Sequence, residues 1–281
     1  MKALFQHLLN PGLALVALLA PMLYIGNGSD TIAFSQIYDG YTTQVYSDAQ
    51  GASIVYYLYV PHNYNPEKRY PLVLILHGGG ERAKPANTLE ENRAHLLSQP
   101  YVQLWSSPTV QSRWPSFILL PQVVWENQWV NTPTAKGSYR LAPQPSNSLR
   151  LAKEIMDALQ REYQGIDPAR LYITGISMGG YGTWDAIERW PTYFAAAAPV
   201  VGAGDPLQAA KLINLPIWAF HGAKDTNVPV SGSRGMIQAI RAAGGHPRYT
   251  EYPQAEHVIW PQAYMSPSFL PWLFAQKSPD R

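Results

Sequence analysis

The chain has 281 residues without a cysteine, and 21 basic against 19 acidic residues leave a formal charge of 21 − 19 = +2. The missing cysteines exclude a thiol nucleophile, a disulfide framework and thiolate metal ligands. The balanced charge argues against nucleic acid or an acidic surface as a partner. We therefore expect a small or neutral substrate and predict neither a cofactor nor a bound metal.

Residues 1–28 have the pattern of a targeting segment. Lys2 supplies a positive charge, residues 12–25 are almost wholly apolar, and small residues follow up to Ser29. The apolar run is shorter than the about 20 residues that a membrane span needs. We interpret the segment as a cleaved signal of a secreted or periplasmic protein, with one catalytic domain over residues 29–281. An uncleaved membrane anchor and a buried N-terminal helix are the alternatives.

The first part of this domain contains a predicted hairpin and two buried strands. Thr42–Ser47 and Ile54–Val60 are β-type stretches around a turn-rich tetrad, which is typical of an antiparallel hairpin. Leu72–Leu76 is a continuous apolar run, as in a strand that is buried on both faces of a parallel sheet. A helix over about 88–98 and a further strand at Ser116–Pro121 follow.

The second part alternates helices with strands after an aromatic segment at 123–146 that shows no periodicity. A helix at Leu149–Tyr163 leads into a strand that ends before Ser177, and a helix at Met178–Trp190 follows it. Eight strands result, and their alternation with helices predicts an α/β fold with a mostly parallel sheet covered on both faces. The remaining elements are expected at Ala195–Val200, Pro216–His221, Ser231–Ala243, Arg248–Tyr252 and Ser268–Gln276.

Gly175 to Gly179 form a G-x-S-x-G motif around Ser177, between an apolar strand and a helix. A serine on so sharp a turn has a strained backbone, and flanking glycines leave room for it. The hydroxyl group is thereby exposed at a helix N-terminus, where the N–H of Met178 can stabilise an oxyanion. We predict that Ser177 is a nucleophile.

A run of three glycines, Gly78 to Gly80, directly follows the buried strand 72–76. Such a loop can turn its N–H groups outward, and an H-G-G-G type loop is the expected partner of a nucleophile elbow. We expect Gly79 or Gly80 to be the second oxyanion donor beside Met178. His77 is interpreted as a structural residue that holds this loop.

A serine nucleophile needs a general base, most often a histidine that a carboxylate holds in one tautomer. Asp225 follows the strand 216–221 on the loop where the acid is expected, and Asp205 is the competitor one strand earlier. We favour Asp225, because the triad of an elbow fold follows the order Ser, Asp, His. His257 comes after the last strand and is the predicted base, whereas His246 precedes that strand and should lie at its far end.

The aromatic content exceeds what a core needs, with nine Trp and eighteen Tyr. Trp125 and Trp129 lie in the segment 123–146, and Trp260 is three residues past His257. All three can reach the carboxyl edge of the sheet, so we predict that they wall a substrate pocket. The alternatives are that these tryptophans belong to the core, or that the segment 123–146 is a surface loop without a role.

Four stretches carry a resemblance to a known family: residues 76–81 (LHGGGE), 174–184 (TGISMGGYGTW), 218–225 (WAFHGAKD) and 249–252 (YTEY). They resemble the α/β-hydrolase group of predicted peptidases and phospholipase/carboxylesterase-like esterases. That group is related to dienelactone hydrolases, polyhydroxybutyrate depolymerases and feruloyl-esterase-like enzymes. The resemblance spans residues 40–276. It implies an α/β-hydrolase fold and a triad of Ser177, Asp225 and His257.

The favoured function is a serine carboxylesterase that acts through an acyl-enzyme on a small or polymeric ester. The first alternative is a serine peptidase of the same fold, although prolyl-peptidase relatives usually carry a large additional domain. The second alternative is a non-catalytic binding module, against which an intact triad argues.

If the signal is cleaved, protein exported from a bacterial host should begin near Ser29, because small residues follow the apolar run there. N-terminal sequencing of the exported protein measures this directly. Recovery of an intact Met1 in the membrane fraction would instead establish an anchor.

Overall fold

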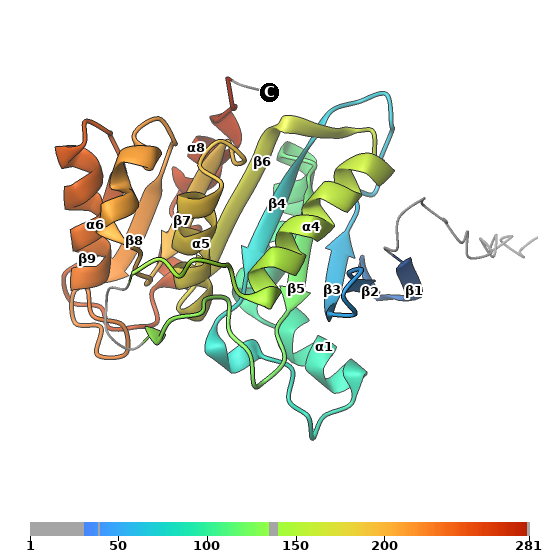
Figure 1. Cartoon of the computed structure of the whole chain (residues 1–281). Helices are drawn as coiled ribbons and strands as arrows, with labels where there is room; N and C mark the ends of the chain where they lie inside the picture. Colours follow the sequence, from blue (N-terminus) through green and yellow to red (C-terminus); the bar gives the residue numbers. More distant parts are fainter. Residues whose placement is uncertain (1–30, 39, 135–139, 280–281) are drawn as a thin grey trace, which may run out of the picture.

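A nine-stranded sheet runs through the middle of the molecule in the order β1-β2-β3-β5-β4-β6-β7-β8-β9 (Figure 1). The computed structural model describes residues 31–38, 40–134 and 140–279, so the predicted targeting segment 1–28 lies outside the described residues. The strands are β1 (Thr31–Tyr38), β2 (Tyr41–Ser47), β3 (Ser53–Tyr59), β4 (Tyr70–Leu76), β5 (Phe117–Gln122), β6 (Ile166–Ile176), β7 (Ala196–Val200), β8 (Trp218–Gly222) and β9 (Arg248–Tyr252).

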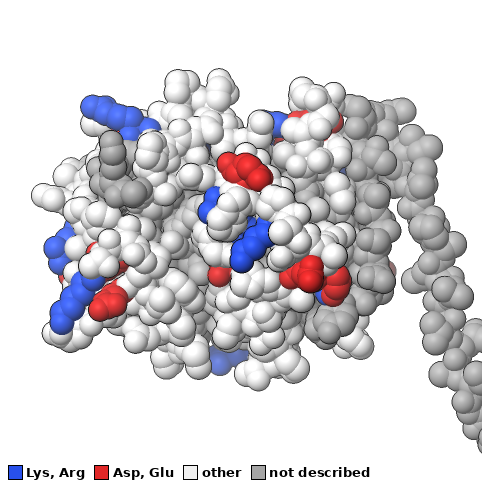
Figure 2. Space-filling view, turned by 90° about the horizontal axis from the view of Figure 1, so that it is seen from below, with Lys and Arg blue, Asp and Glu red and all other residues white. Residues whose placement is uncertain are grey.

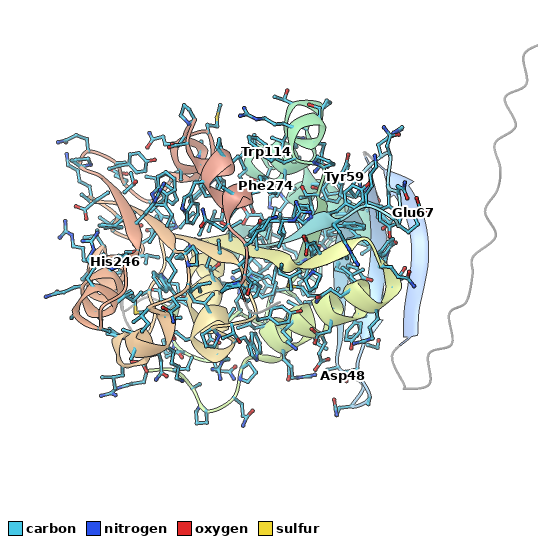
Figure 3. All side chains as sticks on the ribbon, turned by 90° about the horizontal axis from the view of Figure 1, so that it is seen from above. Asp48, Tyr59, Glu67, Trp114, His246 and Phe274 are labelled. Carbon is cyan, nitrogen blue, oxygen red and sulfur yellow. The ribbon has the colours of Figure 1, made fainter. Side chains whose placement is uncertain are left out.

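Helices cover both faces of this sheet (Figures 1 and 3). One face carries α4 (Asn147–Glu162), α5 (Met178–Arg189) and α6 (Ser231–Ala242). The other elements are α1 (Leu89–Leu97), α2 (Pro100–Ser106), α3 (Pro108–Arg113), α7 (Trp260–Tyr264), α8 (Phe269–Ala275) and the 3₁₀ segments η1 (Gly79–Glu81) and η3 (Pro206–Leu212). In the described ranges, no helix is both long and apolar enough to cross a membrane.

The predicted α/β fold with a mostly parallel sheet is confirmed. From β5 to β9 every neighbouring pair is parallel, whereas β1, β2 and β3 form an antiparallel ribbon that joins β5. The sheet has one strand more than the eight predicted, because Thr31–Tyr38 pairs with β2. This ninth strand lies at the edge of the sheet, where β2 is its neighbour.

The apolar run in β4 divides its side chains between the two faces of the sheet. Leu72, Leu74 and Leu76 belong to the core cluster beneath α4, α5 and α6, whereas Val73 and Ile75 belong to the cluster on the opposite face. All seven residues of the strand are buried. A continuous apolar sequence is therefore needed here, as expected for a central strand of a doubly covered sheet.

Three α-helices were not predicted from the sequence, the short α7 and the consecutive pair α2 and α3. Both begin with a proline at the first helical position, Pro100 and Pro108. Proline is favoured at that position, because its fixed φ suits the first turn and its missing N–H has no partner there. The predicted helix near 88–98 is confirmed as α1, which begins with a reciprocal capping box between Thr88 and Glu91.

The N-terminus of α5 lies in direct contact with the ends of β4 and β6. A Cβ atom added to Gly179 would lie 1.9 Å from the carbonyl oxygen of Leu76, and one added to Gly175 would lie 2.4 Å from the carbonyl oxygen of Gly179. Neither position has room for a side chain. The glycines of the predicted motif therefore allow the end of β6 and the start of α5 to pack directly against each other and against the end of β4.

We expect Gly179→Ala to destabilise the protein, because the added methyl group has to push α5 away from the backbone of β4. The free energy of unfolding should fall by about 1–3 kcal/mol or more, as for other overpacked cores. Gly235→Ala in α6 is the matched control, since a Cβ there meets nothing within 4 Å. It should leave the stability unchanged or raise it by about 0.5–1 kcal/mol. Urea unfolding of both variants measures the difference, and equal stabilities would contradict the close contact.

Candidate active site

Ser177 lies between β6 and α5 in a backbone conformation that is rare for a residue with a side chain. Its φ is 53° and its ψ is −115°, and its N–H donates a hydrogen bond of 3.0 Å to the carbonyl of Val200. Such a conformation typically costs about 1–3 kcal/mol and persists only where the surroundings impose it. The strained turn expected from the G-x-S-x-G motif is thus present, and the side chain is half-buried rather than enclosed.

Ser177, His257 and Asp225 form one hydrogen-bonded chain. The distance from Ser177 Oγ to His257 Nε2 is 2.9 Å, and the distance from His257 Nδ1 to Asp225 Oδ2 is 2.8 Å. The Asp225 carboxylate can only accept, so Nδ1 carries a proton and Nε2 of the neutral ring is free to accept from the serine hydroxyl. This arrangement is the one that a general base for Ser177 requires.

The Asp225 carboxylate is fully buried and is held ionised by its donors. Burial by itself raises the pKa of Asp225, but hydrogen bonds from His221, His257 and the N–H of Val228 hold that pKa well below its ordinary value. The resulting stabilisation of the fold is therefore present above the ordinary pKa of about 4 and is lost as the pH falls through the lowered value. An ionised acid at neutral pH is what the imidazole needs as its orienting partner.

His221 is a member of this site that the sequence analysis did not assign. Its ring is fully buried, and Nε2 lies 3.3 Å from Asp225 Oδ2 and 3.0 Å from the carbonyl oxygen of Val228. Both neighbours accept hydrogen bonds, so Nε2 carries a proton and donates. The only signal in the sequence is the place of His221 at the end of a strand, four residues before the acid.

The loop that carries His257 is fixed against the end of β8. A Cβ added to Gly222 would lie 2.0 Å from the carbonyl oxygen of Glu256, which shows how closely the two segments approach. The N–H of Lys224 donates to Ala255 at 2.9 Å, within the same contact. Backbone contacts therefore hold the loops of Asp225 and His257 together, in addition to the hydrogen bond between the two side chains.

The glycine loop after β4 forms η1, and the buried ring of His77 orients its first peptide. His77 Nδ1 lies 2.7 Å from the carbonyl oxygen of Gly78. In a trans peptide the C=O and the following N–H point in opposite directions, so the N–H of Gly79 points away from the His77 ring. Met178 is the first residue of α5, where an N–H has no partner within the helix. Gly80 is more exposed than Gly79, and its carbonyl lies 3.1 Å from Nε2 of His95.

The structure separates the three predicted pocket tryptophans. Trp125 is 43% exposed beside the glycine loop, with the Arg82 guanidinium 4.3 Å from its ring centroid. Trp260 is half-buried, and its ring lies edge-on to that of His257 at 5.7 Å. Their contact with substrate stays a prediction. For Trp129 the prediction is wrong, because its ring is 0% exposed and packs in the core.

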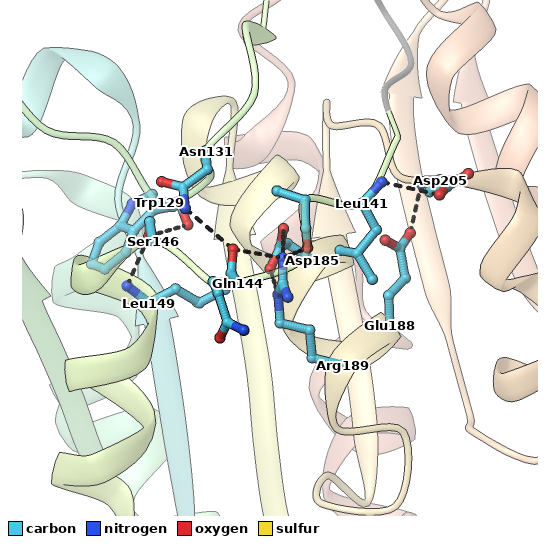
Figure 4. Close-up of polar contacts among 11 residues, drawn as sticks. Trp129, Asn131, Leu141, Gln144, Ser146, Leu149, Asp185, Glu188, Arg189 and Asp205 are labelled. Atoms are coloured by element: carbon cyan, nitrogen blue, oxygen red, sulfur yellow. Dashed lines mark hydrogen bonds and ion pairs between the residues drawn. The ribbon is translucent and has the colours of Figure 1, made fainter.

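Asp205, the competing acid, is engaged elsewhere. Its Oδ2 accepts from the N–H of Leu141 at 3.0 Å, and its own N–H donates to Glu188 at 2.8 Å (Figure 4). Arg189 donates to the carbonyls of Ala142 and Gln144 in the same stretch. Asp205 therefore anchors the end of the predicted aromatic segment against α5, and Arg189 of α5 ties down Ala142 and Gln144 by hydrogen bonds.

Comparison with known proteins shows similarity to hydrolases. A sequence description of the dienelactone hydrolase family matches residues 121–262 of the chain. A solved structure titled as a thermostable esterase is 36% identical with a TM-score of 0.74, over 85% of this chain and 64% of that one. The acylaminoacyl peptidase of Pyrococcus horikoshii has a TM-score of 0.59 at 12% identity, over 89% of this chain and 42% of that one, which shows the fold alone.

One relative combines two activities in its name, the bifunctional acetylxylan esterase/xylanase XynS20E of Neocallimastix patriciarum. It is 27% identical over 223 residues, which are 77% of this chain and 28% of that protein. The chain thus spans less than two thirds of the length of each of these three relatives. The part of the chain that matches the family description, residues 121–262, includes Ser177, Asp225 and His257.

We expect Asp225→Asn to be far more damaging than Asp205→Asn. An amide at position 225 lets His257 adopt the wrong tautomer, which in a serine triad costs roughly 10⁴-fold in kcat. Asp205→Asn keeps an oxygen that can accept from Leu141, so kcat should stay within about twofold. Hydrolysis of p-nitrophenyl acetate, with melting temperatures measured alongside, tests both. A larger loss of kcat at position 205 would reverse the assignment of the acid.

Proposed function

The chain belongs to the dienelactone hydrolase family, and from this we propose that it is a serine hydrolase that cleaves carboxylic esters through an acyl-enzyme intermediate. The observation that carries the proposal is the chain of hydrogen bonds from Ser177 through His257 to Asp225, at 2.9 and 2.8 Å. A serine hydroxyl is a poor nucleophile at neutral pH, and this chain supplies its base.

In the first half-reaction Ser177 Oγ attacks the ester carbonyl while His257 Nε2 takes the hydroxyl proton. The negative charge that develops on the carbonyl oxygen is stabilised by the N–H groups of Met178 and Gly79. We favour Gly79 over Gly80, because the peptide before Gly79 is oriented by the buried His77 ring. His257 then donates its proton to the alkoxide that leaves, and the acyl group remains on Ser177.

In the second half-reaction water replaces the alcohol. His257 takes a proton from the water as it attacks the acyl carbon, and the same two N–H groups stabilise the second oxyanion. Collapse of this intermediate releases the carboxylic acid and returns the proton to Ser177. Asp225 stays ionised throughout and stabilises the imidazolium that forms twice in each cycle.

The substrate that fits this site best is an uncharged ester, either a small molecule or a polymer. Most of the surface at the carboxyl ends of the strands is made of residues other than Lys, Arg, Asp and Glu (Figure 2). Trp125 is 43% exposed, and the ring of Trp260 lies edge-on to that of His257. The name of the relative from Neocallimastix patriciarum, an acetylxylan esterase, supports acylated polymers as one class to test.

We propose the cellular location of the protein from its N-terminal sequence alone. The apolar run at 12–25 between Lys2 and small residues supports export to the periplasm or beyond, with membrane anchoring as the alternative.

We expect Ser177→Ala to abolish ester hydrolysis while the protein stays folded, because a half-buried hydroxyl contributes little to packing. The loss in kcat should reach several powers of ten, as for other triad serines. Ser112→Ala, at an exposed helical serine, is the matched control and should keep full activity. The assay is a series of p-nitrophenyl esters of rising acyl length, with feruloyl esters and p-nitroanilide amides in parallel.

The series separates the candidate functions. Hydrolysis of esters with slow or no cleavage of amides supports the esterase, whereas faster cleavage of amides would make the chain a peptidase. If wild type acts on none of these substrates, the proposed function is wrong. If Ser177→Ala keeps more than a few per cent of the turnover, another residue is the nucleophile.

A further inference from the structure

Trp129 occupies the space between the glycine loop and the helix that carries the nucleophile. Its ring is 0% exposed and lies edge-on to the His77 ring, with the centroids 5.2 Å apart. Its Nε1–H donates a hydrogen bond of 2.9 Å to the carbonyl oxygen of His77. On its other side, a Cβ added to Gly182 in α5 would lie 2.7 Å from Cβ of Trp129. One side chain thus contacts both structures that supply the oxyanion donors.

The His77 ring transmits this contact to the glycine loop. Nε2 of His77 lies 3.0 Å from the N–H of Val123, which can only donate, so Nε2 is unprotonated and Nδ1 carries the hydrogen. Nδ1–H then donates to the carbonyl of Gly78 and sets the plane of the peptide between Gly78 and Gly79. Burial lowers the pKa of His77 to about 4, so the ring stays neutral at ordinary pH.

Trp129 is itself held from the side of α4. The hydroxyl of Ser146 donates to the carbonyl of Trp129 at 2.7 Å and accepts from the N–H of Leu149 at 3.1 Å, where it caps α4 (Figure 4). The tryptophan therefore has a fixed backbone, a fixed ring and one directed N–H. A side chain that is constrained at both ends can hold the group to which it donates.

We propose that Trp129 is a positioning residue for the oxyanion hole, and that its indole N–H and its packing against α5 set the distance between the N–H groups of Gly79 and Met178. This inference rests on the proposed esterase function. An oxyanion hole stabilises the transition state only if its donors are placed before the reaction. A misplacement of about 1 Å can cost roughly 10²-fold in rate even when the altered residue never contacts the substrate.

The first test is Trp129→Phe, which keeps an aromatic ring and removes the N–H donor. We expect kcat to fall by about tenfold to 100-fold while KM stays within about twofold, because ground-state binding does not use the oxyanion hole. The variant should also bind a trifluoromethyl ketone more weakly by a similar factor, since its tetrahedral adduct carries an oxyanion. Trp105→Phe is the matched control, because Trp105 is equally buried and, in the part of the chain that the structure describes, its Nε1 has no partner.

The second test reaches the same contact from the other side. Gly182→Ala keeps the indole but forces a methyl group against it, with Gly235→Ala as its control. We expect the same loss of kcat with KM unchanged, and this variant decides the matter if Trp129→Phe fails to fold. The inference would be overturned if the variants lost activity only through a higher KM. It would also be overturned if they hydrolysed esters as fast as their controls. If wild type itself hydrolyses no ester, the proposed function fails instead, so the two failures are distinct.

Discussion

The contact between the backbone of α5 at Gly179 and the end of β4 at Leu76 is the constraint on which the site depends. A Cβ atom at this position would lie 1.9 Å from the Leu76 carbonyl oxygen, so the helix and the strand meet without a side chain between them. The contact brings the N-terminus of α5 beside the glycine loop that follows β4. Little space is left for the chain to pass from β6 into α5, and the unusual backbone conformation of Ser177 makes this passage possible.

A second backbone contact positions the other half of the site. The end of β8 at Gly222 lies against Glu256, so the loops that carry Asp225 and His257 are joined at their base. The nucleophile and its base thus lie on separately fixed loops of one sheet, and their side chains meet in the hydrogen bond between Ser177 and His257. Rigid units on either side of a reacting group are what preorganised catalysis requires.

Two buried polar side chains around these units are each kept in one charge state by their partners. Asp225 is held ionised by donors from His221, His257 and the backbone. His77 is held neutral by burial, with the N–H of Val123 on one side and the carbonyl of Gly78 on the other. Burial of a charge is tolerated only where it is paired, and burial of a neutral polar group only where it is hydrogen-bonded. Both conditions are met here.

The sequence by itself determined the α/β class, the mostly parallel sheet, the strained turn at Ser177 and the positions of Asp225 and His257 after successive strands. These features follow from local patterns: apolar runs, glycines that no other residue can replace, and an order along the chain that a doubly covered sheet brings to one edge. The tertiary structure alone decided the ninth strand, the role of His221, the anchoring by Asp205 and the burial of Trp129. Trp129 and His77 are 52 residues apart in sequence. A tryptophan suits a core and a pocket wall equally well, so its place is set by long-range packing that no local pattern encodes.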